Sequence, residues 1–313
     1  MLAGITKFGC RSKKVEIFSL PFFMFARKFI LWYDGIEKIN GGDGRMEKLD
    51  FLIEYLLKER GESVERIPIN EIEKKRLYRG LVNIREPKEI SLEFLEAEDL
   101  FLQEELEKKG ITDVSTIQTV KENYPNSALK NPDKICLWRG DITKLKIDCI
   151  VNPANSQGLG CFSPNHNCLD NQVQTIAGVR LRLACNEIMK AKEYHLKTGE
   201  AIITEGYNLP AKHVIHTVGP IIVWEVTKEQ EVELANCYLN SLKLAIENNL
   251  RTISFPGIST GVFRFPKDRA CKIAIDTVDQ FLSENREKMD KVVFNLWDEE
   301  DVKNYEGYIA NHS

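Results

Sequence analysis

The segment ICLWRGDITKLKIDCIVNPAN (residues 135–155) contains two short apolar runs, and each run ends in a loop of polar and small residues. The first run is Ile135–Trp138 and the second is Ile147–Asn152. Short apolar runs that are bounded by turn-forming residues are typical of buried strands. Ligands of parallel sheets bind beyond the carboxyl ends of the strands, so we expect the functional residues of this segment in its loops.

Downstream of this segment, further short apolar runs alternate with amphipathic stretches. Such alternation indicates an α/β domain, here residues 132–313, with helices on both faces of a largely parallel sheet. The predicted strands are Ala201–Thr204, His213–Val218, Thr252–Phe255 and Val292–Leu296, and the predicted helices are Asp170–Lys190, Lys228–Asn248 and Pro266–Glu284.

Residues 46–131 have a helical pattern instead. Apolar residues at 49, 52, 53 and 56 recur at spacings of three and four, as one face of a helix requires. Two further helices are predicted at Ile72–Ile84 and at Ser91–Gly110, where the serine is a suitable start and the glycine a suitable stop. The titratable residues here are mostly Glu and Lys on solvent faces, which predicts a helical N-terminal region without chemistry of its own.

The first 45 residues differ from the rest in composition, with eight basic against four acidic residues. Their apolar stretch, residues 15–33, carries Arg27 and Lys28 in its middle, which is too costly for a plain membrane span. A signal peptide would need a small-residue cleavage site, and no convincing one follows. We therefore predict that residues 1–45 are a poorly ordered extension or a start-site artefact.

Overall composition narrows the function classes. The chain has 313 residues with 43 basic and 47 acidic side chains, so bulk charge does not support non-specific binding to nucleic acid. Hydrophobic residues make up 43%, enough for a sizeable globular core. The eight scattered cysteines are typical of reduced thiols, which favours a cytoplasmic protein.

The loop Gly257-Ile258-Ser259-Thr260-Gly261 matches the pattern of a serine-hydrolase nucleophile elbow. An elbow serine leads directly into its helix, however, and here four residues intervene before Pro266. The only downstream histidine is His312, at the end of the chain. Consecutive N–H groups and two hydroxyls near a helix start suit an anion such as a diphosphate better. An ordinary strand-to-helix turn is the alternative.

Three metal-ligand side chains lie within eight residues: Cys161, His166 and Cys168. Thiolate and imidazole ligands at this spacing favour zinc. Three protein ligands leave a fourth position open, as in metal sites that meet a substrate. A structural site would want a fourth ligand, and Cys149 and Cys185 lie in apolar elements.

Three loops and one insertion together resemble the macrodomain family. The loops are residues 138–143 (WRGDIT), 151–156 (VNPANS) and 259–263 (STGVF), and the insertion is residues 160–171 (GCFSPNHNCLDN). The insertion resembles the zinc-containing, protein-ADP-ribose hydrolase branch, in which a helical region precedes the macrodomain. The resemblance implies a three-layer α/β/α domain with a mixed, largely parallel sheet that binds ADP-ribose and removes it from proteins.

The resemblance also implies which residues form the site. Asp141 would accept a hydrogen bond from the adenine amino group, with the backbone of Ile142 beside it. Asn155 would contact the distal ribose, where the bond to the protein is cut. The other implied contacts are Leu169, Asp170 and Asn171 at the distal ribose, and Ser259, Thr260, Gly261 and Phe263 at the diphosphate and its ribose.

A zinc-assisted hydrolysis follows from these assignments. Cys161, His166 and Cys168 would hold zinc beside the distal ribose, where an open metal position favours hydrolysis. Asp170 would orient the nucleophile or act as a base, and Asn155 would fix the ribose for attack. Zinc is thus the predicted cofactor, and mono-ADP-ribose on a protein the predicted substrate.

Two departures from the family pattern bear on activity. Pro153 replaces an alanine of the usual Asn-Ala-Ala-Asn run, and Val173-Gln174 stands where Ile-His is common. If that histidine orients the pocket, Gln174 must substitute through its amide. An ADP-ribose-binding reader module without turnover is therefore the alternative function. A zinc-stapled nucleic-acid-binding protein is disfavoured because no basic patch with interleaved aromatic residues is present.

The expected protein partners follow from the resemblance alone. In zinc-containing bacterial relatives the modified substrate is likened to a lipoyl-carrier protein, and the partner enzyme to a sirtuin-like ADP-ribosyltransferase. ADP-ribose itself would be the product ligand. Neither nucleic acid nor a membrane is expected as a partner.

Overall fold

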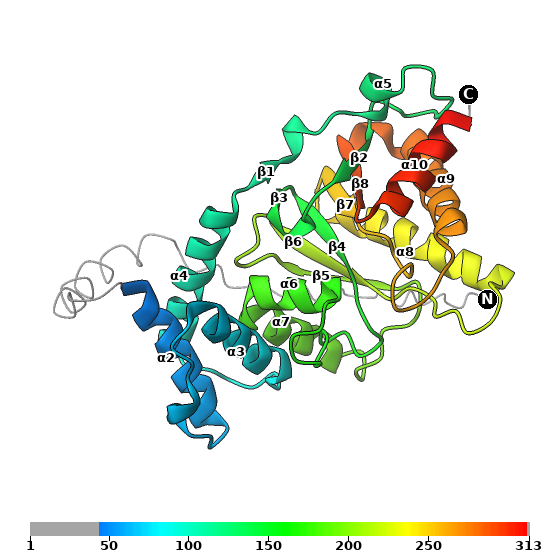
Figure 1. Cartoon of the computed structure of the whole chain (residues 1–313). Coiled ribbons are helices and arrows are strands. Elements are labelled where there is room, and N and C mark those ends of the chain that lie inside the picture. Colours follow the sequence, from blue (N-terminus) through cyan, green and yellow to red (C-terminus); the bar gives the residue numbers. More distant parts are fainter. Residues whose placement is uncertain (1–43, 312–313) are drawn as a thin grey trace, which may run out of the picture. The chain divides into compact units, whose positions relative to one another are not determined.

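The computed structural model describes residues 44–311, and residues from Arg45 onward form one compact unit (Figure 1). The prediction for residues 1–45 therefore lies outside the described residues, apart from Gly44 and Arg45. Between residues 44 and 311, no helix combines the length and the apolar character needed to cross a bilayer.

The helices are α2 (Gly44–Glu59), α3 (Glu71–Ile84), α4 (Leu92–Lys109), α5 (Val120–Asn123), α6 (Leu169–Ala177), α7 (Val179–Lys190), α8 (Lys228–Glu247), α9 (Lys267–Asn285) and α10 (Glu299–Asn311). Short 3-10 helices are η3 (Val64–Arg66), η4 (Val114–Thr116), η5 (Ile142–Lys144) and η6 (Arg286–Lys288).

A six-stranded sheet forms the centre of the domain. Its order is β2-β8-β7-β4-β6-β5, and every neighbouring pair is parallel except β5 with β6. The predicted mixed, largely parallel sheet is therefore confirmed. The strands are β2 (Ile135–Arg139), β4 (Cys149–Pro153), β5 (Ala201–Glu205), β6 (His213–Thr217), β7 (Thr252–Phe255) and β8 (Lys291–Leu296), and two-residue strands β1 (Thr112–Asp113) and β3 (Leu145–Lys146) pair separately.

Helices cover both faces of this sheet. Side chains alternate along β4, so that Cys149 and Val151 pack toward α8 and α9 while Ile150 packs toward α6 and α7. Figure 1 shows α8, α9 and α10 on one side of the strands and α6 and α7 on the other. The predicted three layers are confirmed, and α10, which the sequence pattern did not predict, completes the first of the two helical layers.

The N-terminal helices α2, α3 and α4 share a separate apolar core. The face predicted from the spacing of Leu49, Leu52, Ile53 and Leu56 is buried there, since each of these side chains is at most 1% exposed. Val179, the first residue of α7, packs into the same core and joins the N-terminal helices to the α/β domain.

Two parts of the predicted pattern are wrong. Residues 110–131 contain only β1, η4 and the four-residue α5, because Asp113 and Thr119 each cap a short helix and Pro125 interrupts the segment. The single helix predicted at 170–190 is two helices, because Gly178 between them has a φ of 87°.

A carboxylate from the N-terminal region occupies the space beside that glycine. Glu98 of α4 is fully buried, and its Oε2 accepts a hydrogen bond from the backbone N–H of Val179 at 2.8 Å. Tyr78 of α3 donates its hydroxyl to Glu98 Oε1 at 2.6 Å. A Cβ at Gly178 would lie 2.7 Å from Glu98 Oε2. Burial raises the pKa of Glu98 to about 7 despite both hydrogen bonds.

Glu98 makes stability depend on pH with a defined sign. Its pKa is about 7 in the folded chain against 4.5 for an unperturbed group, so the unfolded chain loses the proton first as pH rises. We expect the free energy of unfolding of the wild type, relative to Glu98→Gln, to fall by about 3 kcal/mol between pH 4.5 and 7 and to stay level above that. Urea unfolding across this range measures the difference, with the exposed Glu96→Gln as control. If the difference in unfolding free energy between wild type and Glu98→Gln does not change with pH, the raised pKa of Glu98 is refuted.

Candidate active site

The candidate site lies at one edge of the sheet. Strands β2, β8, β7 and β4 are neighbours in this order, and each pair is parallel. The loops that follow β2, β7 and β4 therefore emerge at the same edge of the sheet. Three strand spacings separate β2 from β4, which corresponds to roughly 14 Å. The predicted adenine, diphosphate and ribose loops therefore follow one another along this edge in that order.

The loop after β2 holds Asp141 and Ile142 in a defined turn. Asp141 Oδ1 accepts hydrogen bonds from the backbone N–H of Thr143 at 3.0 Å and from its hydroxyl at 2.6 Å, and thereby caps η5. Asn295 of β8 donates its amide to the carbonyl of Gly140 at 2.8 Å. Asp141 is thus a half-buried carboxylate at a fixed position on the β2 end of the edge.

The loop after β7 offers unused hydrogen-bond donors. Within residues 44–311, the backbone N–H groups of Ser259, Thr260 and Gly261 donate to no other protein atom. Ser259 has a φ of 63° and is 6% exposed, and its hydroxyl has no hydrogen-bond partner. Phe263 accepts from the N–H of Ile222 at 2.8 Å through its carbonyl, which joins this loop to the segment after β6. These donors are available for the anion that the sequence predicts at this loop.

A nucleophile elbow does not fit the same loop. Helix α9 begins only at Lys267, and Ser259 Oγ contacts no histidine among the described residues. Gly219 lies so close that a Cβ there would be 2.0 Å from Ser259 Oγ. The hydroxyl is therefore held against backbone and has no base to activate it.

A buried carboxylate lies at the β4 end of the edge. Asp170, in the first turn of α6, is 5% exposed, and its Oδ1 accepts a hydrogen bond from Asn152 Nδ2 at 2.7 Å. Burial raises the pKa of Asp170 to about 6, against the opposing effects of the Asn152 hydrogen bond and the charge of Arg182. A buried carboxylate that a neighbouring amide holds in place is a candidate general base.

A hydrogen-bonded chain extends inward from Asp170. Asn152 Nδ2 also contacts Nδ1 of the buried His216 at 3.1 Å, and Nε2 of that ring contacts the hydroxyl of Thr204 at 3.0 Å. Because the Asn152 amide must donate to the carboxylate, its nitrogen faces the ring as well. His216 Nδ1 is then an acceptor, and the proton lies on Nε2. Burial lowers the pKa of His216 to about 4.

Asn155 and Asn171 use their amides within the protein. Asn155 Nδ2 donates to the carbonyl of Gly160 at 3.0 Å, and its Oδ1 accepts from the N–H of Gln157 at 3.0 Å. Asn171 is fully buried, and its Nδ2 donates to the carbonyl of Ser163 at 2.9 Å. Both residues therefore fix the loop at 155–168, whose end lies beside Leu169 and Asp170 at the start of α6.

The three predicted metal ligands converge. Cys161 Sγ and His166 Nδ1 lie 3.7 Å apart, and the ligand atoms of Cys161, His166 and Cys168 all lie within 4.8 Å of one another. Tetrahedral zinc holds sulfur and nitrogen ligands roughly 3.5–3.8 Å apart, so the triad needs a shift of about 1 Å at most. Cys149 and Cys185, the conceivable fourth ligands, are buried elsewhere and do not join this group. The residues fit a zinc ion with one open position.

The two departures from the family pattern have different surroundings. Pro153 is the last residue of β4 and leaves Asn152 and Asn155 in the positions described above. Gln174 is 5% exposed, and neither atom of its amide has a hydrogen-bond partner in the described chain. Gly160 packs directly on it, because a Cβ there would lie 2.5 Å from Gln174 Cγ. Gln174 thus fills space below the loop.

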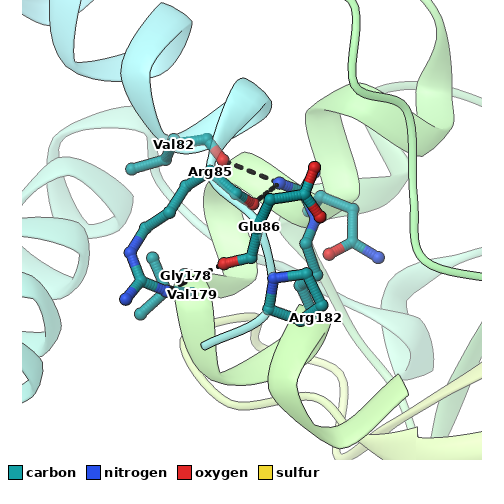
Figure 2. Close-up of a pocket in the computed structure, with 8 residues that line it drawn as sticks. Val82, Arg85, Glu86, Gly178, Val179 and Arg182 are labelled. Carbon is teal, nitrogen blue, oxygen red and sulfur yellow. Dashed lines mark hydrogen bonds between the residues drawn. The ribbon is translucent and has the colours of Figure 1, made fainter. Parts of the chain in front are cut away.

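Two arginines that hold this loop were not predicted. Arg79 of α3 donates to the carbonyl of His166 at 2.7 Å and to Oδ1 of Asn171 at 2.8 Å. Arg182 of α7 donates to the carbonyls of Leu159 and Cys161 and to three carbonyls at the end of α3. Figure 2 shows Arg182 with the carbonyl groups of Val82 and Arg85, beside a small pocket. No local pattern marks either arginine, since their partners lie far away in the sequence.

The fold and this edge together define an α/β domain built to bind an extended anionic ligand. Residues 151–274 match the family model described as Macro domain. A protein-ADP-ribose hydrolase from Treponema medium is 45% identical over 260 residues, which cover 83% of this chain and 97% of that protein. One from Staphylococcus aureus (strain MSSA476) is 43% identical, covering 82% and 93%. A Trypanosoma brucei macrodomain, solved in complex with ADP-ribose, superposes with a TM-score of 0.56 at 29% identity, covering 71% of this chain and 92% of that one.

The chain belongs to the macrodomain family. The family predicted from the sequence is therefore confirmed. The assignment to its zinc-containing branch and the individual residue roles remain predictions.

The buried histidine gives a prediction for this site. We expect the His216 ring to stay neutral, with its proton on Nε2, from pH 8 down to about 5. Its pKa is about 4 in the folded chain against 6.5 for an unperturbed group, so the unfolded chain binds the proton first as pH falls. Acidification between these values therefore lowers the free energy of unfolding. Imidazole ¹⁵N shifts report the tautomer, with the signal assigned by its loss in His216→Asn. A signal that titrates near pH 6.5 would refute the assigned environment.

Proposed function

We propose that this protein is a hydrolase that removes mono-ADP-ribose from modified proteins, and that zinc assists it at the distal ribose. The observation that carries the proposal is the position of Asp170. This buried carboxylate lies two residues from Cys168, one of the three side chains that converge as candidate metal ligands, and at the opposite end of the edge from Asp141. The curated relatives named protein-ADP-ribose hydrolase support the reaction class.

Each loop has a separate part in this proposal. Asp141 binds the adenine amino group, with the Ile142 backbone beside it. The free N–H groups of Ser259, Thr260 and Gly261 bind the diphosphate, and Phe263 packs against the neighbouring ribose. This binding energy lies far from the bond that is cut, so its role is to anchor the substrate.

The residues around the distal ribose carry the chemistry. Asn155, whose amide also orders its own loop, contacts the distal ribose and fixes it for attack, and Leu169 and Asn171 complete that end of the site. Water adds to the ribose carbon, and the acceptor side chain of the modified protein leaves with the electron pair of the bond that breaks. Asp170 takes the proton from the attacking water, while Asn152 holds the carboxylate in place. Zinc, when bound by Cys161, His166 and Cys168, would supply a Lewis acid at this position.

The reader module remains the second candidate. The observation that favours it is the amide of Gln174, which stands where the family commonly has a histidine and forms no hydrogen bond to another nitrogen or oxygen atom of the described residues. A reader needs the anion-binding loop and Asp141 but has no use for an open metal position next to a carboxylate. The two functions therefore differ in turnover and not in affinity for ADP-ribose.

The modified protein is identified only by the resemblance. A lipoyl-carrier protein as the acceptor and a sirtuin-like transferase as the partner enzyme stay predictions, as does a cytoplasmic location. A lipoyl-carrier protein modified by such a transferase is the substrate to test first.

The metal can be tested directly. We expect protein purified without chelators to contain about one zinc ion per chain, and the double variant Cys161→Ala/Cys168→Ala to contain none, because two of the three ligands are lost. Elemental analysis measures the content, and Cys271→Ala, which removes a buried thiol outside the group, is the control. Metal-free wild-type protein in such preparations would refute the zinc assignment.

Two conservative variants separate binding from turnover. Asp141→Asn keeps the oxygen that caps η5 but loses the charge, so ADP-ribose should bind about 10-fold to 100-fold more weakly, equivalent to very roughly 1.5–3 kcal/mol. Asp170→Asn still accepts from Asn152 but cannot act as a base, so turnover should fall by ~100-fold or more with affinity nearly unchanged. Calorimetry and single-turnover release from a mono-ADP-ribosylated acceptor measure the two effects.

The controls of this experiment also decide between the two functions. Wild-type protein that binds ADP-ribose but releases none from any acceptor, with zinc present, would establish the reader module. Parallel losses of affinity and rate in both variants would refute the division of roles between Asp141 and Asp170.

A further inference from the structure

The metal loop is held from outside the α/β domain by helix α3. Three residues on one face of this helix, Arg79, Gly80 and Asn83, contact the turn at 163–166 between the first two metal ligands. Asn83 Oδ1 accepts from the backbone N–H of Asn165 at 2.9 Å. A Cβ at Gly80 would lie 3.0 Å from Asn165 Nδ2, so the absence of a side chain lets the turn pack against the helix.

Arg79 makes the most specific of these contacts. Its Nη2 donates to the carbonyl of His166 at 2.7 Å, and both Nη2 and Nε donate to Oδ1 of Asn171, at 2.8 and 3.1 Å. Because the guanidinium is planar and rigid, these bonds fix the carbonyl and the amide relative to each other. One side chain thus connects the backbone of a ligand residue to the first turn of α6.

Asn171 passes this constraint to the other two ligands. Its backbone N–H contacts Cys168 Sγ at 3.4 Å, and its Nδ2 donates to the carbonyl of Ser163, which lies between Cys161 and His166. Arg79 therefore acts on the positions of the ligands without touching the ion. Hydrogen-bond partners of metal ligands commonly orient the ligands in this way without binding the metal themselves.

We infer that Arg79 of the N-terminal helix α3 is a positioning residue of the metal site, which holds the His166 and Cys168 ends of the loop in the arrangement that binds the ion. The inference rests on the proposed zinc site. It makes the N-terminal helical region a functional part of that site, although none of its residues is a metal ligand.

The test measures zinc affinity rather than activity. Zinc-loaded full-length protein is titrated with a chromophoric chelator to obtain the dissociation constant. We expect Arg79→Ala to bind zinc about 10-fold to 100-fold more weakly, the usual effect of losing a hydrogen-bond partner of a metal ligand. Arg79→Lys should lie in between, because an ammonium group keeps the charge but cannot bond both acceptors in the same geometry.

A matched control lies on the same helix. Arg76→Ala removes the same charge three residues away, from an exposed side chain that lines the open groove beside α3, and should leave zinc affinity unchanged. Thermal unfolding of the metal-free proteins separates positioning from general stability. We expect Arg79→Ala and Arg76→Ala to unfold within a few degrees of each other while differing in zinc affinity. If Arg79→Ala does not fold, Arg79→Lys is compared with Arg76→Lys in the same way.

The outcomes distinguish this inference from the function it rests on. Wild-type affinity for zinc in both Arg79 variants would overturn the positioning role and leave the zinc site standing. Equal losses in the Arg76 and Arg79 variants would also overturn it, because the effect would then be one of charge. A wild-type protein that holds no zinc would refute the metal site, and this inference with it.

Discussion

The site depends on one buried guanidinium. Arg182 is 5% exposed, and it donates to five carbonyl oxygens: two in the loop that holds Cys161, and three at the carboxyl end of α3. Burying a cation without partners would cost far more than one hydrogen bond returns. Here the carbonyls at the end of a helix carry partial negative charge, Asp170 supplies a full one nearby, and the ring of Phe162 lies 4.3 Å from the guanidinium carbon. The Arg182 guanidinium therefore joins helix α3, helix α7 and the loop that contains Cys161. If any of these three parts moved away, buried carbonyl groups would lose their hydrogen-bond donor.

Four of the six buried side-chain polar atoms that lack a hydrogen-bond partner among the described residues lie near the same edge. Asn152 Oδ1, Ser259 Oγ and both amide atoms of Gln174 are buried without partners. Each such atom costs about 1–3 kcal/mol, which a fold tolerates where a ligand or water completes the set. Asn152 and Ser259 lie at opposite ends of the proposed diphosphate-to-ribose path, so ligand binding can recover part of that cost at both. Gln174 lies below the loop, and its two unpaired atoms make it the least well-fitted residue of the site.

The sequence predicted what short-range patterns encode. The sheet, its strands and the three convergent ligands follow from apolar runs and from spacing, which act over a few residues. The break at Gly178 was missed because it depends on Glu98, eighty residues away, whose carboxylate occupies the space of a Cβ. Helix α10 was missed because its buried residues, such as Tyr305 and Ile309, are few and widely spaced among charged ones. Arg79 and Arg182 escaped for the same reason as Glu98, since only the tertiary structure brings their partners within reach.

Because of these long-range contacts, the N-terminal helices and the α/β domain form one functional unit. The match to the Macro domain model spans residues 151–274, which include the three proposed metal ligands and the proposed anion-binding loop but neither Asp141 nor Arg79. The Treponema medium relative aligns over 260 residues, whereas only 182 residues of this chain follow Asn131, so the similarity must extend into the N-terminal helical region. A helical region that served only as a scaffold could be covered by any apolar surface. The N-terminal helical region of this chain does more than cover an apolar surface. Its helix α3 fits the turn at 163–166, and the carbonyl groups at the end of α3 accept hydrogen bonds from Arg182. The helical region and the loop are therefore shaped for each other.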